Sequence, residues 1–369
     1  MGRRAPKVAQ LDKRMAPLAG STTPMVWHDP GDMPLRLAGF PWFAQERTYR
    51  RLPKRPAEKL PAAVDQLADC TAGGQVSFRT DSRQVAVRVE LAGPADMCHM
   101  PATGQCGFDL YVGAAPEQRF HSVTKYDVRS RSYETLLFDH PETLLRDFTL
   151  NFPLYQGVRQ VLVGLLPGAQ VAPPVPWTLE GPVVAYGTSI TQGGCASRPG
   201  MAWTNILSRA LNVEIVNLGF SGNGKGEPEV LRLVAQVAGA RLFVLDYEGN
   251  AGGREQLAHS LPECIRILRQ AHPAVPILVV SRIAFASDLT HAQSRAEREL
   301  SRDMQARLVE RLRLAGDCNL HFLDGSTRLG PDFTEGTVDG VHPTDLGFMR
   351  MAAALEPELR RLLGLNGPQ

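Results

Sequence analysis

The feature that most limits the possible folds is a series of short, uninterrupted apolar segments in the second half of the chain, separated by longer segments with helical spacing. Uninterrupted apolar segments are typical of strands that are buried on both faces of a parallel sheet. Five of them alternating with helices predict an α/β domain with a five-stranded parallel sheet. In such a sheet, functional residues gather in the loops beyond the carboxyl ends of the strands. The expected strands are VVAYG (183–187), EIVNLG (214–219), RLFVLDY (241–247), PILVVSRIAF (276–285) and NLHFLDG (319–325).

The first half of the chain has a different pattern, in which apolar and other residues alternate. In QVAVRVEL, for example, Val85, Val87 and Val89 follow one another at a spacing of two. Short alternating segments between turn residues predict an antiparallel β-sandwich of jelly-roll-like form. A proline-rich segment follows, and proline stiffens a linker because it fixes φ. The expected division is a flexible basic tail (1–23), the β-sandwich (24–170), a stiff proline-rich linker (171–182) and the α/β domain (183–369).

Composition excludes several classes of protein. The 40 lysines and arginines nearly balance the 38 aspartates and glutamates, so the net charge of +2 creates no field that would attract nucleic acid. No apolar segment approaches the roughly 20 residues of a membrane-spanning helix. The six cysteines form no Cys-x-x-Cys pair, and the histidines outside the motifs below lack ligand spacing, so we expect no metal. The N-terminus lacks the apolar segment of a secretory signal, which predicts a cytoplasmic protein.

A candidate nucleophile follows the first expected strand of the α/β domain. The segment GTSITQG places Ser189 in a turn at the mouth of the sheet, close to backbone N–H groups. The alternative is that Ser189 only caps the next helix, as serine often does. Cys195 lies a few residues later, and such a cysteine is more often a small packing residue.

A candidate base lies near the C-terminus, in the segment DGVHP. A serine hydroxyl is a weak nucleophile at neutral pH and needs a base that accepts its proton. Histidine suits this role, and a carboxylate can fix its tautomer. At this spacing in a turn, Asp339 can reach Nδ1 of His342 while Nε2 faces outward. The two residues therefore form a candidate base and its partner.

Two further loops contain groups that could stabilise an oxyanion. The segment NLGFSGN (217–223) follows the second expected strand and supplies glycines whose N–H groups can approach closely. The segment YEGNAG (247–252) follows the third strand and supplies an amide side chain. Taken singly, these are ordinary turn residues.

In this order along the chain, the segments resemble the SGNH (GDSL-type) hydrolase family. GTSITQG is similar to the first block of that family, NLGFSGNG to the second, EGNAG to the third and DGVH to the fifth. The resemblance implies a flavodoxin-like, three-layer α/β/α domain. By motif it also implies Ser189 as nucleophile and Asp339 and His342 as its partners. The implied oxyanion donors are the Ser189 N–H, Gly222 and Asn250.

Two positions depart from the family pattern. Thr188 stands where an Asp usually precedes the nucleophile, which is a frequent variation. Ala251 stands where an Asp normally follows the third-block Asn. Asn223 is therefore a competitor of Asn250 for the third donor.

The segments PWFAQERTYRRLP, FRTDS, GFDLYV and FPLYQGV in the first half resemble the β-sandwich that precedes some SGNH catalytic domains. Such two-domain proteins include carbohydrate esterases and acyltransferases of natural-product pathways. The resemblance implies serine-dependent acyl transfer from a small-molecule or carbohydrate ester, or from a thioester such as acyl-CoA. The acceptor is water in an esterase and a hydroxyl group in an acyltransferase, and both remain open. No cofactor is expected apart from an acyl-CoA co-substrate.

We expect the sandwich to border the substrate pocket, because an acyltransferase must exclude water from its acyl-enzyme. The side chains expected at the substrate are Trp42, His99 and Met100 from the sandwich and Tyr247 and Phe285 from the α/β domain.

Two other functions compete with this interpretation. GFSGNGK (219–225) after a strand fits a phosphate-binding P-loop, with Asp246 ending a Walker B-like strand. However, Gly226 stands where a Ser or Thr must ligate Mg²⁺. The second competitor is a carbohydrate-binding protein without catalysis, which the filled Ser189, Asp339 and His342 positions disfavour.

Overall fold

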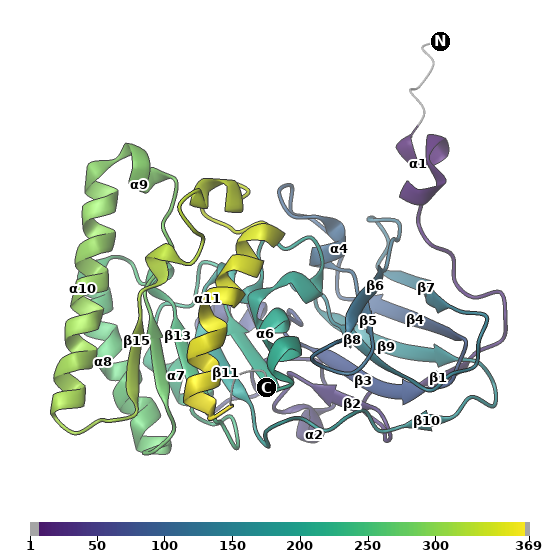
Figure 1. Cartoon of the computed structure of the whole chain (residues 1–369), viewed down its shortest axis with the longest axis horizontal. Helices are drawn as coiled ribbons and strands as arrows, with labels where there is room; N and C mark the ends of the chain where they lie inside the picture. The colour runs from purple at the N-terminus through teal and green to yellow at the C-terminus, as the bar shows by residue number, and fades with distance from the viewer. Residues whose placement is uncertain (1–6, 366–369) are drawn as a thin grey trace, which may run out of the picture.

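The computed structural model describes residues 7–365 and contains a β-sandwich followed by an α/β domain (Figure 1). The five strands of the α/β domain are all parallel, in the order β12-β11-β13-β14-β15. This order is the one expected of a flavodoxin-like sheet. The strands are β11 (Val183–Gly187), β12 (Ile215–Gly219), β13 (Leu242–Asp246), β14 (Ile277–Val280) and β15 (Leu320–Leu323).

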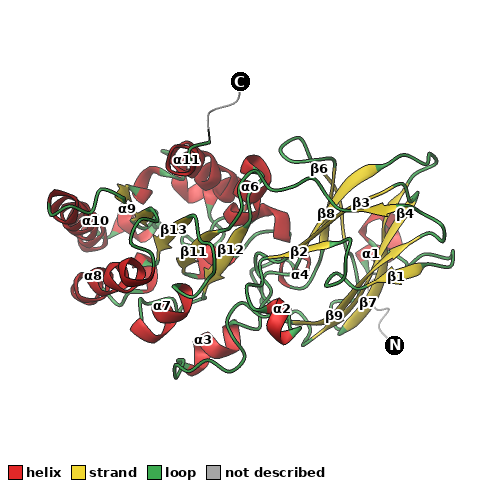
Figure 2. Ribbon diagram, turned by 90° about the horizontal axis from the view of Figure 1, so that it is seen from below, coloured by secondary structure: helices red, strands yellow, loops and turns green. Residues whose placement is uncertain are grey.

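Helices cover both faces of this sheet, as Figure 2 shows, so the predicted three-layer fold is confirmed. On one face, α7 (Pro228–Val234), α8 (Arg254–Ala271) and α10 (Ala292–Leu314) contribute to one apolar core. On the other face, α6 (Trp203–Leu211) and α11 (Asp345–Leu363) contribute to a second. The short helices of this domain are α5 (Ser189–Gln192) and α9 (Ser287–Thr290). Within residues 7–365, no helix combines the length and hydropathy needed to span a bilayer.

The strand β14 is shorter than the sequence predicts. It ends at Val280, five residues before the expected end at Phe285. The Ser281 N–H still donates to Leu323 O of β15 at 3.2 Å. The chain leaves the sheet at Arg282, because the Arg282 N–H donates to Glu248 Oε2 at 2.7 Å instead of to a strand. The apolar residues Ile283 and Phe285 therefore belong to a loop beyond the carboxyl end of the strand.

The predicted β-sandwich is confirmed as two antiparallel sheets that enclose a separate apolar core. One sheet has the order β1-β9-β4-β7, and the other has the order β10-β3-β8-β5-β6, with β2 paired to β3. The strands are β1 (Val26–His28), β2 (Arg36–Ala38), β3 (Gln75–Thr80), β4 (Gln84–Leu91), β5 (Asp109–Val112), β6 (Arg119–Val123), β7 (Ser132–Asp139), β8 (Arg146–Asn151), β9 (Val158–Leu165) and β10 (Val171–Ala172). The short helices are α1 (Val8–Leu11), α2 (Phe43–Glu46), α3 (Ala62–Leu67) and α4 (Ala102–Gln105).

Both ends of the sandwich lie differently from the predicted boundaries. Val171 and Ala172, expected in the linker, form β10 and pair with Thr80 and Arg79 of β3. At the other end, residues 1–6 of the predicted tail lie outside the described residues. The Leu18 N–H donates to Lys125 O at 2.7 Å, so the chain joins the sandwich before the predicted start at residue 24.

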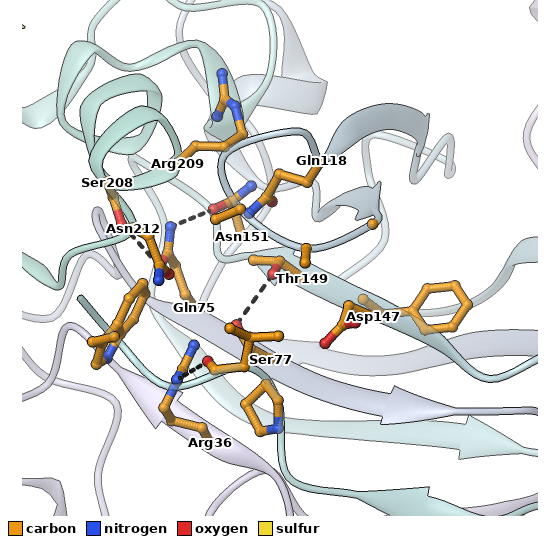
Figure 3. Close-up of a pocket in the computed structure, with 17 residues that line it drawn as sticks. Arg36, Gln75, Ser77, Gln118, Asp147, Thr149, Asn151, Ser208, Arg209 and Asn212 are labelled. Carbon is orange, nitrogen blue, oxygen red and sulfur yellow. Dashed lines mark hydrogen bonds between the residues drawn. The ribbon is translucent and has the colours of Figure 1, made fainter. Parts of the chain in front are cut away.

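A polar junction joins the sandwich to α6 (Figure 3). Gln75 Nε2 donates to Asn151 Oδ1 at 2.9 Å within the sandwich, and Gln75 Oε1 accepts from Ser208 Oγ of α6 at 3.4 Å. The cavity beside these residues has a volume of about 30 Å³, which is room for one or two waters and not for a substrate. This cavity is therefore too small to be the substrate site.

Candidate active site

Ser189 begins α5, directly after β11, at the carboxyl edge of the sheet. Thr188 caps this short helix, because its Oγ1 accepts from the Ile190 N–H at 3.1 Å. The capping role considered for Ser189 thus belongs to Thr188, and the Ser189 hydroxyl is left for another partner.

The sandwich supports the turn that carries Ser189. Tyr155 of the FPLYQGV segment donates from its hydroxyl to Ser189 O at 3.1 Å. Gln192 Nε2 donates to Leu154 O at 3.1 Å, and Gln192 Oε1 accepts from the Ser221 N–H at 3.0 Å. One sandwich loop therefore fixes α5 and, through Gln192, the loop that follows β12.

Ser189, His342 and Asp339 form a continuous chain of hydrogen bonds. Ser189 Oγ lies 2.9 Å from His342 Nε2, and His342 Nδ1 lies 2.7 Å from Asp339 Oδ2. Asp339 Oδ1 also accepts from the N–H groups of Val341 at 3.0 Å and His342 at 2.7 Å. Burial alone would raise the pKa of Asp339, but the hydrogen bonds from His342 and Val341 lower it to about 2. The carboxylate is therefore ionised at neutral pH and orients the imidazole towards Ser189.

Close backbone packing builds the loop after β12. A Cβ on Gly219 would lie 2.3 Å from the Gln192 backbone nitrogen, so only glycine fits where this strand meets α5. Gly222 has φ of +67°, which favours glycine and turns the loop back over the strand end. The loop thereby brings Gly222 to the same pocket as Ser189.

Asn250, and not Asn223, lies at this pocket. We orient the Asn250 amide so that its oxygen faces donors, which places Oδ1 3.3 Å from the N–H groups of Gly222 and Asn223. The Asn223 side chain instead donates to Ser221 O at 2.7 Å within its own turn. Of the two competing asparagines, the structure therefore brings Asn250 together with Ser189 and Gly222.

The pocket beside Ser189 has a volume of about 290 Å³. Its apolar wall combines Ile190 and Val341, which flank the Ser189–His342 pair in sequence, with Ile283 and Phe285 from the loop after β14. All its lining residues come from the α/β domain, between Thr188 and His342, so the prediction that the sandwich borders the pocket is wrong. The pocket is large enough for a small acyl or aromatic group. The sandwich contacts α5, which carries Ser189, through Tyr155 and Leu154.

Two arginines that the sequence analysis did not predict, Arg282 and Arg328, line the same pocket together with Asp246. Arg328 and Asp246 are both buried and make an ion pair at 3.1 Å. Burial raises the pKa of Asp246, and the neighbouring Arg328 opposes that rise. Arg282 bonds Asp288 at 3.0 Å and lies over the Phe285 ring at 4.3 Å. Their places in the sequence could have indicated this, because Arg282 and Arg328 follow the ends of β14 and β15 within a few residues, where functional residues gather.

The five predicted substrate contacts have different locations in the structure. Phe285 lines the pocket, and the ring of His99 lies 5.9 Å from the ring of His342. Trp42 packs against the apolar core on one face of the parallel sheet, and Met100 is buried in the core on the other. Tyr247 is buried and its hydroxyl lies 2.9 Å from Ser260 Oγ. Trp42, Met100 and Tyr247 do not line the pocket, because Met100 and Tyr247 are buried in the apolar cores and Trp42 packs, partly buried, against one of them.

The P-loop alternative is not supported by the loop geometry. The helix that follows, α7, begins at Pro228, so no helix N-terminus lies at Gly226 to face a phosphate. The Lys225 N–H donates to Glu227 Oε2 at 3.0 Å, and Asp246 is bound to Arg328.

Comparisons with known proteins agree with this architecture. Residues 180–360 match the sequence model of the GDSL-like lipase/acylhydrolase family, and residues 25–171 match the N-terminal domain of SGNH hydrolase-type esterases. No curated protein sequence matches the chain.

Solved structures extend the similarity to both domains. A protein from Bacteroides ovatus described as a GDSL-like lipase is 29% identical, with a TM-score of 0.85 over 94% of this chain and 100% of its own. A salicylyl-acyltransferase from a tetracycline biosynthetic pathway is 24% identical, with a TM-score of 0.71 over 92% and 97%. A family two carbohydrate esterase from Clostridium thermocellum is 16% identical, with a TM-score of 0.57 over 80% and 94%. The last two show the fold alone. The chain belongs to the SGNH (GDSL-type) lipase/acylhydrolase family, carries the N-terminal β-sandwich of its two-domain members, and is an enzyme that acts on ester bonds.

Proposed function

We propose that this enzyme transfers acyl groups through an acyl-Ser189 intermediate. The observation that carries the proposal is the hydrogen-bond chain from Ser189 Oγ to His342 Nε2 at 2.9 Å and from His342 Nδ1 to Asp339 Oδ2 at 2.7 Å. In this arrangement the imidazole can accept the serine proton while the ionised carboxylate fixes its tautomer.

The reaction proceeds in two matched halves. His342 accepts the proton of Ser189 as Oγ attacks the carbonyl carbon of an ester or thioester, and a tetrahedral intermediate forms. The bond to the leaving group then breaks, and His342 returns the proton to the leaving oxygen or sulfur. In the second half, water or a hydroxyl acceptor gives its proton to His342 and attacks the acyl-serine, and a second tetrahedral intermediate forms. The bond to Ser189 Oγ then breaks, and His342 returns the proton to Oγ as the acid or new ester leaves.

Three groups around Ser189 are proposed to bind the oxyanion: the Ser189 N–H, the Gly222 N–H and the Asn250 amide. Such donors typically contribute ~3 kcal/mol each to transition-state stabilisation. The Gly222 N–H lies 3.3 Å from Asn250 Oδ1, which is long for an N–H···O bond. When an oxyanion takes this N–H, the Asn250 amide must turn so that Nδ2 and not Oδ1 faces the oxyanion.

The pocket favours a compact acyl group. Its apolar wall of Ile190, Ile283, Phe285 and Val341 suits a short acyl chain or an aromatic acid. Arg282 and Arg328 are each paired with an aspartate, so they add polar groups to the pocket wall and no net positive charge. Donors of this class include small esters, acetylated carbohydrates and thioesters such as acyl-CoA, with water or a hydroxyl as acceptor.

A covalent probe tests the nucleophile. We expect the folded protein to form a serine adduct with a fluorophosphonate and an acyl adduct with p-nitrophenyl esters or acyl-thioesters, both visible as mass shifts. S189A should lose both adducts. S221A, which removes another serine of the same pocket, should keep them. An adduct that persists in S189A, or no adduct on the folded wild-type protein, would overturn the proposal.

Adding alcohol or sugar acceptors to the pre-formed acyl-enzyme then separates hydrolysis from transfer. An esterase releases free acid at a rate that the acceptor does not change. An acyltransferase forms the new ester and consumes the acyl-enzyme faster as the acceptor concentration rises.

A further inference from the structure

Three metal-ligating side chains meet beside the Ser189–His342 pair. They are His99, Cys195 and His342, and one ligand atom from each lies within 4.8 Å of the other two. They come from three separate segments: a sandwich loop, the segment after α5 and the loop before α11. No local spacing in the sequence reveals the cluster, because the domain junction assembles it.

We propose that this cluster is an inhibitory site for Zn²⁺ or a similar soft divalent cation, and the inhibition rests on the proposed role of His342. A thiolate with two imidazoles is a typical zinc donor set, whereas Mg²⁺ and Ca²⁺ prefer oxygen. In a tetrahedral zinc site, with bonds of about 2.0–2.3 Å, neighbouring donor atoms lie roughly 3.3–3.8 Å apart. Separations of up to 4.8 Å must shorten by up to about 1–1.5 Å to reach this geometry, and rotation of the exposed His99 side chain can supply part of that movement.

The geometry makes inhibition a direct consequence of binding. Both ring nitrogens of His342 are already hydrogen-bonded, Nε2 with Ser189 and Nδ1 with Asp339. A metal on either nitrogen must replace one of these bonds. It therefore removes either the proton acceptor of Ser189 or the group that orients the imidazole.

The thiol completes the site when it loses its proton. Cys195 is buried beside the two imidazoles, and its thiol releases one proton to solvent when it binds the metal. The exposed position of His99 leaves the fourth coordination position to water, and chelators can reach the metal from solvent. Binding is therefore reversible.

The experiment has an optical readout that does not need activity. Co²⁺ is titrated into S189A, which keeps all three ligands, and the thiolate-to-cobalt charge-transfer absorption is recorded. We expect this band in S189A, and we expect its loss when C195S is added. The matched control adds C98S, which removes an exposed cysteine next to His99 and should keep the band.

A second experiment measures how Zn²⁺ inhibits ester hydrolysis. The rate of each variant is expressed relative to the rate of the same variant without Zn²⁺. We expect Zn²⁺ but not Mg²⁺ to inhibit the wild-type enzyme, and EDTA to restore the rate. H99Q and C195S should each raise the Zn²⁺ concentration that gives half inhibition by at least roughly 10–100-fold. Loss of a residue that only bonds a metal ligand lowers metal affinity by this factor, and loss of a ligand itself should lower it at least as much. Unchanged inhibition in both variants, or a band that depends on Cys98, would overturn the site. A wild-type enzyme without activity but with a Cys195-dependent band would overturn the proposed function and leave the metal site standing.

Discussion

Asp339 bonds the same short turn through both of its oxygens. Oδ2 holds the imidazole of His342 at 2.7 Å, while Oδ1 accepts from the backbone N–H of His342 at 2.7 Å. D339N preserves the shape of the side chain, but its amide nitrogen would face Nδ1 and favour the tautomer in which Nε2 carries the proton. That imidazole cannot accept the proton of Ser189. We expect kcat for ester hydrolysis to fall by about 10⁴-fold, with a nearly unchanged melting temperature.

The matched control is D332N, which replaces a surface aspartate that pairs with Arg350 shortly before the same turn. It should leave kcat within about twofold, because exposed pairs contribute only about 0–1 kcal/mol. If D339N retained more than about a tenth of the wild-type kcat, another group would orient His342.

At the scale of elements, a single arginine of the sandwich half holds the end of β12. Arg51 is fully buried, and its guanidinium donates to Gly219 O at 2.6 Å, Leu67 O at 2.7 Å and Cys70 O at 2.7 Å. Burial lowers the pKa of Arg51 to about 10, so it stays charged at neutral pH. The single ammonium group of R51K cannot reproduce the planar, branched guanidinium. Some of these buried carbonyls would lose their donors, which destabilises the fold by about 1–3 kcal/mol for each lost donor.

We therefore expect R51K to lower the melting temperature and also to lower kcat, because Gly219 leads into the loop that carries Gly222. R55K, an exposed arginine four residues later, is the control and should change neither quantity. An R51K protein with a lower melting temperature but unchanged kcat would show that Arg51 contributes to folding only.

The elements also show why sequence predicts part of the fold and not the rest. The strand β11 matches its prediction residue for residue, because a buried parallel strand is an uninterrupted apolar segment with glycine at its end. β14 does not, because Ile283 and Phe285 are as apolar as strand residues but line a pocket. The positions of Ser189, Asp339 and His342 were predicted from short motifs. Arg51 and Arg328 were not, because their partners lie far away in the sequence and no local pattern encodes them.

At the scale of the whole molecule, the two domains are joined by a buried ion pair. Asp109 of the GFDLYV segment accepts from Arg198 at 2.9 Å and from the Gly200 N–H at 2.8 Å, across the domain junction. D109N would leave the Arg198 charge without its partner. Removing one member of a buried pair costs about 3–5 kcal/mol, so we expect a loss of that size in urea unfolding followed by circular dichroism. D127N, which breaks an exposed pair in the same domain, should cost less than about 1 kcal/mol.

The sandwich does not line the pocket, but it contacts the residue that carries the nucleophile, because the Tyr155 hydroxyl donates to Ser189 O at 3.1 Å. Y155F removes this bond and leaves the ring in place. A net hydrogen bond is worth about 0.5–1.5 kcal/mol, so if the bond positions the nucleophile, kcat should fall roughly threefold to tenfold with little change in KM. Y133F is the matched control, because Tyr133 donates to Cys106 O at 2.8 Å inside the sandwich. Both variants should lose similar stability, but only Y155F should lose kcat. Equal kcat values in the two variants would mean that the sandwich stabilises the enzyme without positioning Ser189.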